Sequence, residues 1–281
     1  MSELLKYSLV MVLVLLLHSC GSDSTTKQKE DTTETSNSKV TACEIIQCQN
    51  ALEIKVANNE LFALRNIKSK NGVISRLKFP DKKWNNLPGK DFQSFVVSKS
   101  GQIYGIKNTK TKKGIIVFTD GKKWKKLPGS DYNSIALDGS DSLYAITKKK
   151  NKNEIVRWKN DKWETLYKTT NIKNLLVKSP DEIYVIKGPK LTGSIHKLEN
   201  KNLVKVSKSG IQDFTIHNGN ITAIKNTKNK GDLAMILNNE GKWKNLTSRE
   251  TKSIDFDDKY IYTLEVNKSD KTYIRKCLSK S

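Results

Sequence analysis

The side chains that most often carry out catalysis or bind metal ions are scarce in this 281-residue chain. Only three histidines are present, and no carboxylate motif accompanies His196 or His217. No His and Cys residues have the spacing of a zinc site, and neither a Gly-x-Ser-x-Gly turn nor a glycine-rich phosphate loop occurs. Asp138 and Asp141 occur in a short Gly-containing segment, and we expect them to form a turn. We therefore expect no enzyme activity, no catalytic residue, no cofactor and no bound metal, although a glycosidase carboxylate pair from separate strands would leave no local motif.

Lysine is the one chemically active side chain in large excess. Lys and Arg number 51 against 29 Asp and Glu, which gives a formal net charge of +22. Such a surface attracts polyanions over roughly a Debye length, about 8 Å at physiological ionic strength. Lysine without interleaved aromatic residues provides no base stacking, so we expect no specific nucleic-acid binding. A general Lys- and Asn-rich composition would give the same charge, so the positions of the lysines must decide between these interpretations.

The elements that position these lysines repeat about every forty residues. A short apolar segment, aliphatic-aromatic-x-aliphatic in five of its six copies, begins at Leu61, Ile103, Leu143, Ile183, Ile221 and Ile261. A second marker, Trp-x-x-Leu or a variant of it, begins at Trp84, Trp124, Trp163, Leu203 and Trp243. A period near forty with four short strands per unit is typical of a β-propeller. The sequence therefore predicts an all-β fold, a six-bladed propeller of four-stranded antiparallel blades.

The sixth repeat lacks its fourth strand. Residues 253–256, 261–266 and 272–278 supply three strands, after which the sequence reaches Ser281. Residues 40–46 stand where an outer strand belongs, judged from their spacing to the first repeat. We expect this N-terminal strand to complete the sixth blade and close the ring, because an open sheet edge would invite aggregation. We accordingly expect a monomer.

The first residues have the features of an export signal. Lys6 precedes an apolar run at residues 8–17, which suits a signal peptide, whereas a membrane-spanning helix needs about twenty residues. Residues 17–20, Leu-His-Ser-Cys, resemble the end of a bacterial lipoprotein signal, where cleavage precedes a lipidated cysteine. His18 departs from that pattern, since a small residue is more common there. An ordinary secretory signal followed by a chance cysteine is the alternative.

The polar segment after the apolar run predicts a tether. Residues 20–39 contain almost only Ser, Thr, Asp, Glu, Lys, Gln and Asn, so they have no apolar side chains with which to form a core. The expected domains are a lipoprotein signal peptide at 1–19, a lipidated Cys20 with its disordered tether at 20–39, and the propeller at 40–281. The lipoprotein resemblance implies a protein held in a bacterial outer membrane by several acyl chains, which anchor stably where one would not.

The other three cysteines fit the proposed closure. Cys277 lies on the third strand of the last repeat, and Cys43 lies on the N-terminal strand expected beside it. Directly paired strand residues have Cα atoms about 4.5–5.5 Å apart, within disulfide range. Pairing of Cys48 with Cys277 or with Cys43 also stays open, and each choice leaves one thiol over.

Two repeats resemble a known propeller family. Residues 84–89 (Trp-Asn-Asn-Leu-Pro-Gly) and 124–129 (Trp-Lys-Lys-Leu-Pro-Gly) each precede a Ser-x-aliphatic strand, a Gly-bearing turn and an aliphatic-Tyr pair. This order is similar to the tectonin repeat, although Trp163 and Trp243 lack the Pro-Gly and the fourth repeat lacks the tryptophan. Tectonin-type propellers include six-bladed lectins, some of which bind lipopolysaccharide or modified sugars. For the tryptophans themselves we expect packing between blades.

The excess lysines gather in the loops between second and third strands. In a propeller these loops share one face with the connections between blades, so their charges should add. The density is greatest over the first three repeats. Six of these lysines lie in equivalent loops of two adjacent repeats: Lys110, Lys112, Lys113, Lys148, Lys149 and Lys150. We expect these six lysines to bind an anionic glycan or glycolipid such as lipopolysaccharide. The alternatives are a scaffold for envelope proteins, or lysines that collect in hairpin loops for solubility alone.

Overall fold

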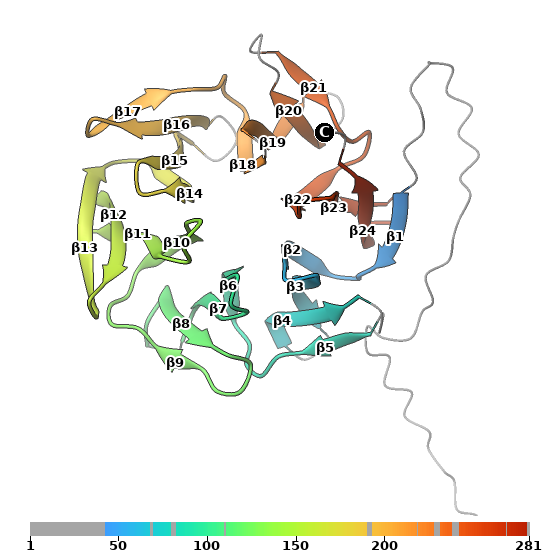
Figure 1. Ribbon diagram of the computed structural model, residues 1–281, viewed down its shortest axis with the longest axis horizontal. Helices are drawn as coiled ribbons and strands as arrows, with labels where there is room; N and C mark the ends of the chain where they lie inside the picture. Colours follow the sequence, from blue (N-terminus) through green and yellow to red (C-terminus); the bar gives the residue numbers. More distant parts are fainter. Residues whose placement is uncertain are drawn as a thin grey trace, which may run out of the picture.

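Six four-stranded antiparallel sheets form a ring in the computed structural model of this protein (Figure 1). The structure describes residues 43–67, 70–79, 83–109, 111–189, 193–217, 219–227, 231–237, 242–267 and 269–279. Every regular element among them is a strand, and none of these residues forms a helix able to span a membrane. The predicted all-β, six-bladed β-propeller is confirmed. The expected signal peptide, Cys20 and the tether lie outside the described residues.

The first three blades follow one another along the chain. Blade 1 consists of β2 (Ala51–Ala57), β3 (Glu60–Ile67), β4 (Lys70–Lys78) and β5 (Trp84–Asn86). Blade 2 consists of β6 (Phe92–Val97), β7 (Ile103–Lys107), β8 (Ile115–Thr119) and β9 (Lys125–Lys126). Blade 3 consists of β10 (Tyr132–Leu137), β11 (Leu143–Lys149), β12 (Lys152–Lys159) and β13 (Lys162–Thr169).

The last three blades continue the ring back to the first. Blade 4 consists of β14 (Ile172–Ser179), β15 (Glu182–Lys187), β16 (Ser194–Glu199) and β17 (Asn202–Lys205). Blade 5 consists of β18 (Ile211–His217), β19 (Asn220–Thr227), β20 (Gly231–Leu237) and β21 (Trp243–Asn245). Blade 6 consists of β22 (Thr251–Phe256), β23 (Tyr260–Val266), β24 (Thr272–Leu278) and, as its outermost strand, β1 (Cys43–Gln47).

The core lies between the blades. Each blade begins at the ring axis, and its innermost strand carries a buried apolar residue at the fourth position: Ile54, Phe95, Ile135, Leu175, Phe214 and Ile254. Each of these side chains belongs to a different buried cluster, and each cluster combines residues of two neighbouring blades. Full burial of one such side chain stabilises the fold by about 1.5–3 kcal/mol. Every blade therefore depends on the next one for its core.

A β-bulge recurs near the start of every innermost strand. The pairing of each with its neighbour shifts by one residue, for example between Ala51 and Glu53 and between Phe92 and Ser94. A bulge re-aims the side chains that follow it. Residues of all six innermost strands, at and beyond the bulge, line a cavity at the axis.

The tryptophans join blades, as predicted. The indole N–H of Trp124 donates to the carbonyl oxygen of Pro88 at 2.6 Å, and that of Trp163 donates to the carbonyl oxygen of Pro128 at 3.0 Å. The Trp124 ring also packs on Phe92, with ring centres 4.7 Å apart. The Pro carbonyls belong to the connections between blades, so the Trp and Pro-Gly parts of the repeat hold blades 2 and 3 to the chain segments that enter them.

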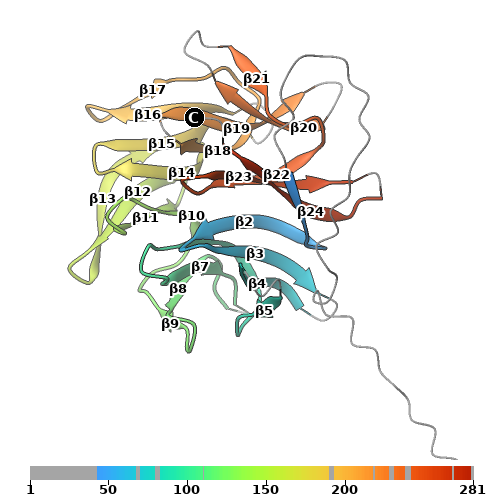
Figure 2. The ribbon, with the colours of Figure 1, turned by 45° about the vertical axis from the view of Figure 1, so that its right-hand side comes forward.

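The N-terminal strand closes the ring as predicted. β1 pairs antiparallel with β24 in a register that places Cys43 opposite Cys277, and the two form a disulfide with Cα atoms 4.3 Å apart. β1 lies beside β24 in both views of the ring (Figures 1 and 2). Cys48, the third described cysteine, is buried in the seam between blades 6 and 1 and takes no part in this disulfide. Of the three pairings left open by the sequence, Cys43–Cys277 is confirmed.

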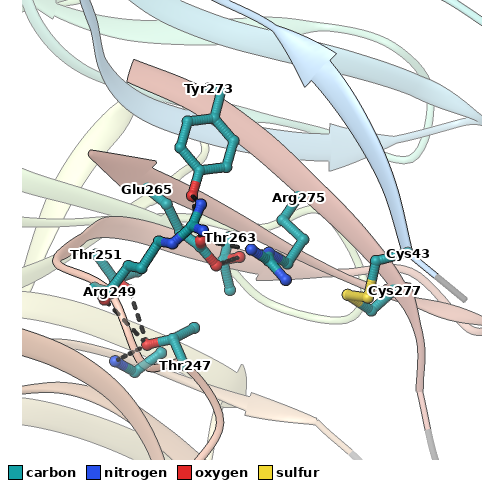
Figure 3. Close-up of polar contacts among 10 residues, drawn as sticks. Cys43, Thr247, Arg249, Thr251, Thr263, Glu265, Tyr273, Arg275 and Cys277 are labelled. Atoms are coloured by element: carbon teal, nitrogen blue, oxygen red, sulfur yellow. Dashed lines mark hydrogen bonds and ion pairs between the residues drawn. A yellow bond between two sulfur atoms is a disulfide. The ribbon is translucent and has the colours of Figure 1, made fainter. Parts of the chain in front are cut away.

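Blade 6 also holds a buried carboxylate. Glu265 is 1 % exposed and accepts hydrogen bonds from the hydroxyl groups of Thr263, at 2.8 Å, and Tyr273, at 2.7 Å (Figure 3). The guanidinium of Arg275 lies 3.3 Å away, and Arg249 donates to the Tyr273 hydroxyl at 2.8 Å. Because Arg249 precedes β22, this network fixes the connection from blade 5 to the closing sheet.

Removing the disulfide should weaken the whole ring. The bond joins residues 234 positions apart, and the chain-entropy model gives an upper bound of about 5 kcal/mol for so long a loop. We expect Cys277→Ser to lower the free energy of unfolding by up to that amount, measured by urea denaturation. Wild-type protein in a thiol reductant is the control and should unfold at the same urea concentration as the variant. Equal midpoints for the variant and the oxidised wild type would contradict the role of the closure.

Candidate functional site

The lysine-rich loops lie on one side of the ring. Because neighbouring strands are antiparallel, connections from second to third strands and connections between blades emerge on the same side. We call this side the loop face. On it, between blades 2 and 3, lies a cavity of about 640 Å³ that we call the lysine groove. Its lining residues are Gln93, Ile106, Asn108, Lys113, Gly114, Asp131, Tyr132, Asn133, Lys148 and Lys150.

Three of the six predicted lysines meet at this groove. Lys113 comes from the loop between β7 and β8, while Lys148 and Lys150 come from the end of β11 and the turn after it. Among the described lining residues the one carboxylate is Asp131, which accepts a hydrogen bond from its neighbour Ser130 at 2.8 Å. Three ammonium groups against one carboxylate leave the groove with net positive charge.

The close approach of two backbones positions the groove. Gly114 has a left-handed backbone conformation with φ 56°, and a Cβ atom there would lie 2.2 Å from the carbonyl oxygen of Tyr132. The backbone N–H of Tyr132 donates to the oxygen of Gly114 at 3.0 Å, and that of Asp131 donates to the oxygen of Lys113 at 3.0 Å. Only glycine fits such a contact without strain. These contacts therefore fix the position of the Lys113 backbone relative to blade 3.

The other three predicted lysines do not line the groove. Lys149 stands between Lys148 and Lys150 in the sequence, but its ammonium lies 2.9 Å from the carboxylate of Glu154. The Lys112 backbone N–H donates to Thr109 in a local turn, and its side chain is exposed. Lys110 lies outside the described residues. The binding role of all six lysines stays a prediction.

Glu154 explains why Lys149 is separate. Its side chain is 7 % exposed, and Lys168 approaches it at 3.4 Å from the opposite strand. The hydrogen bond from Lys149 is the main cause that lowers the pKa of this carboxyl, and Lys168 adds to it against the opposing effect of burial. Lys149 thus belongs to an ion pair within blade 3 and shares the Glu154 carboxylate with Lys168.

A second cavity follows the ring axis and holds about 780 Å³. We call it the axial cavity. All six innermost strands line it. Its charged residues all come from the side formed by blades 5, 6 and 1, namely the exposed Glu250 and Lys252 and a less exposed cluster of Glu53, Lys55, Asp213 and Asp255. The Lys55 ammonium lies 3.3 Å from Glu53, and the Asp255 carboxylate accepts the backbone N–H of Val56 at 2.7 Å. The sequence prediction missed this site.

Burial and mutual attraction shift the ionisation of this cluster. Burial raises the pKa of Glu53 and of Asp255, and Lys55 opposes that rise in both. Burial alone would lower the pKa of Lys55, but the carboxylates of Glu53, Asp255 and Asp213 outweigh it and raise the value. Lys55 is therefore held in its charged form, among three carboxylates.

The opposite side of the axial cavity carries no charged residue and combines aliphatic side chains with polar ones such as Ser94 and Asn174. Val96, Ala136 and Leu176, from blades 2, 3 and 4, occupy the strand positions that Lys55 and Asp255 occupy in their own blades. Gln93 and Asn133 line both the axial cavity and the lysine groove. The two cavities thus adjoin at the loop face.

The residues first considered for catalysis lie elsewhere. His196 on β16 has its Nδ1 3.0 Å from the carbonyl oxygen of Ser194, and burial lowers its pKa. His217 stacks on Phe256 with ring centres 4.7 Å apart. Asp138 forms a turn, as predicted, by accepting the backbone N–H groups of Ser140 and Ser142. In the part of the chain that the structure describes, no three His, Cys, Asp or Glu residues form a group that could hold a metal ion.

Comparison with known proteins gives a fold and no family. No family model and no curated protein matches this chain. The chain is similar to a luciferin-regenerating enzyme, with TM-score 0.62 and 10% identity over 85% of this chain and 95% of that one. It is similar to the PQQ-bound aldose sugar dehydrogenase of Streptomyces coelicolor, with TM-score 0.60 and 9% identity over 85% and 98%.

A third similar structure, Pyrococcus horikoshii acylaminoacyl peptidase, has TM-score 0.52 and 13% identity. The match covers 83% of this chain but 46% of that protein, so the chain spans about half the length of this relative. At such identities these structures support the propeller fold alone. The tectonin resemblance and the lipoprotein signal stay predictions.

The Glu154 ion pairs should make stability depend on pH in a defined way. A carboxyl group that has a lower pKa in the folded protein than in the unfolded protein stabilises the fold at pH values above its unfolded-state pKa. This stabilisation is lost as the pH falls through the pKa of the folded state. We expect Glu154→Gln to lower the free energy of unfolding by up to about 1 kcal/mol at pH 7, since both lysines are exposed. The difference from wild type should shrink as the pH falls from about 5 to about 3, measured by urea denaturation. A difference that does not change with pH would contradict the assignment.

Proposed function

We propose that this protein is a non-enzymatic binding protein that recognises an anionic glycan or glycolipid through the lysine groove. The observation that carries the proposal is the convergence of Lys113, Lys148 and Lys150 on one cavity between two blades. Its volume of about 640 Å³ falls within the range of ligand pockets, about 300–1,000 Å³. Net positive charge favours an anion there.

The rest of the lining suits a sugar. Gln93, Asn108 and Asn133 bring amide groups that can both donate to and accept from hydroxyl groups. A carboxylate, Asp131, adds an acceptor. The Asn108 side-chain oxygen already accepts the backbone N–H of Gly114 at 2.9 Å, which fixes the orientation of that amide. Point charges together with fixed amides favour an acidic saccharide, such as the phosphorylated sugars of lipopolysaccharide.

We further propose that the protein is anchored in a bacterial outer membrane through acyl chains on Cys20. The apolar run at residues 8–17 and the Leu-His-Ser-Cys sequence that ends it support this. Anchoring near glycolipids would raise the local concentration of such a ligand.

Charge reversal tests the binding site. The variant Lys113→Glu/Lys148→Glu/Lys150→Glu should bind lipopolysaccharide at least tenfold more weakly than wild type at low salt, measured by titration of the soluble propeller. Wild-type binding should itself weaken between low and physiological ionic strength, because exposed charges are screened. The control is Lys122→Glu/Lys123→Glu/Lys201→Glu, three exposed lysines on the opposite face.

Two results would contradict the proposal. Equal losses from both triple variants would mean that net charge, and no particular site, is responsible. Binding that does not respond to salt would exclude the ammonium groups as the main contacts. A glycan array with the wild-type protein would then locate neutral sugars that bind elsewhere.

Lipid anchoring has its own test. Cys20→Ser should move the protein from the membrane fraction to the soluble fraction and abolish labelling by a palmitate analogue. A wild-type protein that carries no lipid label but stays in the membrane fraction would contradict the proposed anchor.

An envelope scaffold is the second candidate, and the outer edge of blade 3 favours it. β13 has eight residues, whereas the outermost strands of the other blades have two to five. β13 is also the last strand of its sheet, so its outer backbone groups face away from the blade. Such an edge can accept an extended peptide as a further strand. Loss of a protein partner in the variant Leu166→Pro, with glycan binding unchanged, would support this alternative.

A further inference from the structure

The axial cavity has the construction of a second binding site, and the lysine groove does not use it. It encloses about 780 Å³ along the axis of the ring, which is the size of a drug-like ligand pocket. Its two sides differ in chemistry. The side from blades 5, 6 and 1 carries four carboxylates and two ammonium groups, whereas the side from blades 2, 3 and 4 carries aliphatic and uncharged polar groups.

The repeats themselves indicate that this cavity is specialised. At the third position of the innermost strands the six blades carry Glu53, Ser94, Ser134, Asn174, Asp213 and Ser253. Two of the serines have a structural role, since Ser134 accepts the backbone N–H of Leu175 at 2.9 Å and Ser253 accepts that of Ile54 at 3.1 Å. A short hydroxyl is therefore enough to join neighbouring blades here. Glu53 and Asp213 have longer or charged side chains that this hydrogen bond between blades does not require.

Both larger carboxylates keep an acceptor oxygen available. Glu53 uses Oε1 for Lys55 and for the hydroxyl of Ser94. Asp213 uses Oδ1 for the backbone N–H of Phe214 and for the Asn174 amide, at 2.9 and 3.0 Å. Glu53 Oε2 and Asp213 Oδ2 have no hydrogen bond to the described residues. Both residues line the cavity, so a donor of a bound molecule can reach these oxygens.

The internal lysine does not neutralise the cluster. With all six lining groups ionised, four carboxylates and two ammonium groups leave the charged side with two negative charges in excess. The surrounding molecule is strongly basic, but exposed charges are screened beyond about 8 Å at physiological ionic strength. A cation inside the cavity would therefore respond chiefly to the carboxylates beside it.

We propose that the axial cavity binds a ligand that carries an ammonium group on an aliphatic body. The ammonium would donate to Glu53 Oε2 and Asp213 Oδ2, and the aliphatic part would contact Val96, Ala136 and Leu176 on the opposite side. The two sides favour the two parts of this ligand, because a polyol would make less use of the three aliphatic side chains and the excess carboxylates would repel an acid. The inference concerns a different ligand from the anion of the lysine groove and does not depend on it.

Probes that differ in one group test the proposal on the wild-type protein. Hexylamine, which is charged at pH 7, should bind at least tenfold more tightly than hexan-1-ol, and hexanoate should not bind measurably, by isothermal titration calorimetry. Propylamine should bind more weakly than hexylamine because it reaches less of the aliphatic side. Equal binding of hexylamine and hexan-1-ol would overturn the proposal.

Variants locate the site. Glu53→Gln/Asp213→Asn should weaken hexylamine binding at least tenfold, and Lys55→Met should strengthen it at least threefold, because removal of the internal ammonium leaves more negative charge. Thermal unfolding of each variant confirms that the ring is folded, and the single variant Glu53→Gln replaces the double one if the latter is not.

The matched control is Asp131→Asn, which removes a carboxylate from the lysine groove and should change hexylamine binding by less than twofold. Loss of binding in this control, or unchanged binding in the folded Glu53 and Asp213 variants, would place the amine outside the axial cavity and overturn the proposal.

Discussion

Apolar packing between neighbouring blades is the interaction on which the rest of this structure depends. A four-stranded blade of this sequence has no core of its own, since its buried residues complete clusters that include the next blade. Six such seams must form, and the sixth joins the two ends of the described chain. There Ile46 and Cys48 stand beside Tyr262, Leu264 and Ile274 in one cluster. The Cys43–Cys277 disulfide holds β1 on β24 within blade 6, and the chain continues from β1 into β2 of blade 1. The disulfide therefore secures this seam, while the Glu265 network fixes the connection from blade 5.

The same packing creates the two cavities. Wedge-shaped blades bring their innermost strands close to the axis, where the exposed edges of those strands need hydrogen-bond partners. Side chains from neighbouring blades supply them, as when the Asp255 carboxylate accepts the backbone N–H of Val56. Polar groups are consequently necessary at the axis, and the bulges turn them towards it. The lysine groove has a related origin, since the close contact of Gly114 with Tyr132 leaves a hollow above it between two blades.

Much of the fold was predictable from the sequence, and the reason is periodicity. The forty-residue period predicted the blade number, the missing strand predicted the closure, and the position of Cys277 on the neighbouring strand predicted the disulfide. The separation of Lys149 from Lys148 and Lys150 was also within reach, because alternate residues of a strand point to opposite sides. The axial cavity was harder to predict from the sequence. Its charged residues come from three blades, and each one alone is indistinguishable in the sequence from an ordinary surface residue.

The six repeats within this one chain separate the positions that build the ring from those that can differ. The apolar residue that packs between blades is Ile, Leu or Phe in every innermost strand, since a polar group there would lose about 2 kcal/mol or more on burial. The residues that face the axis range from Ala136 to Lys55 and Asp255. These positions line the axial cavity, where polar and charged side chains are tolerated beside aliphatic ones. The ring can therefore carry opposite charges in adjacent cavities, a basic groove between blades 2 and 3 and an acidic axis, without a change in the packing that holds it together.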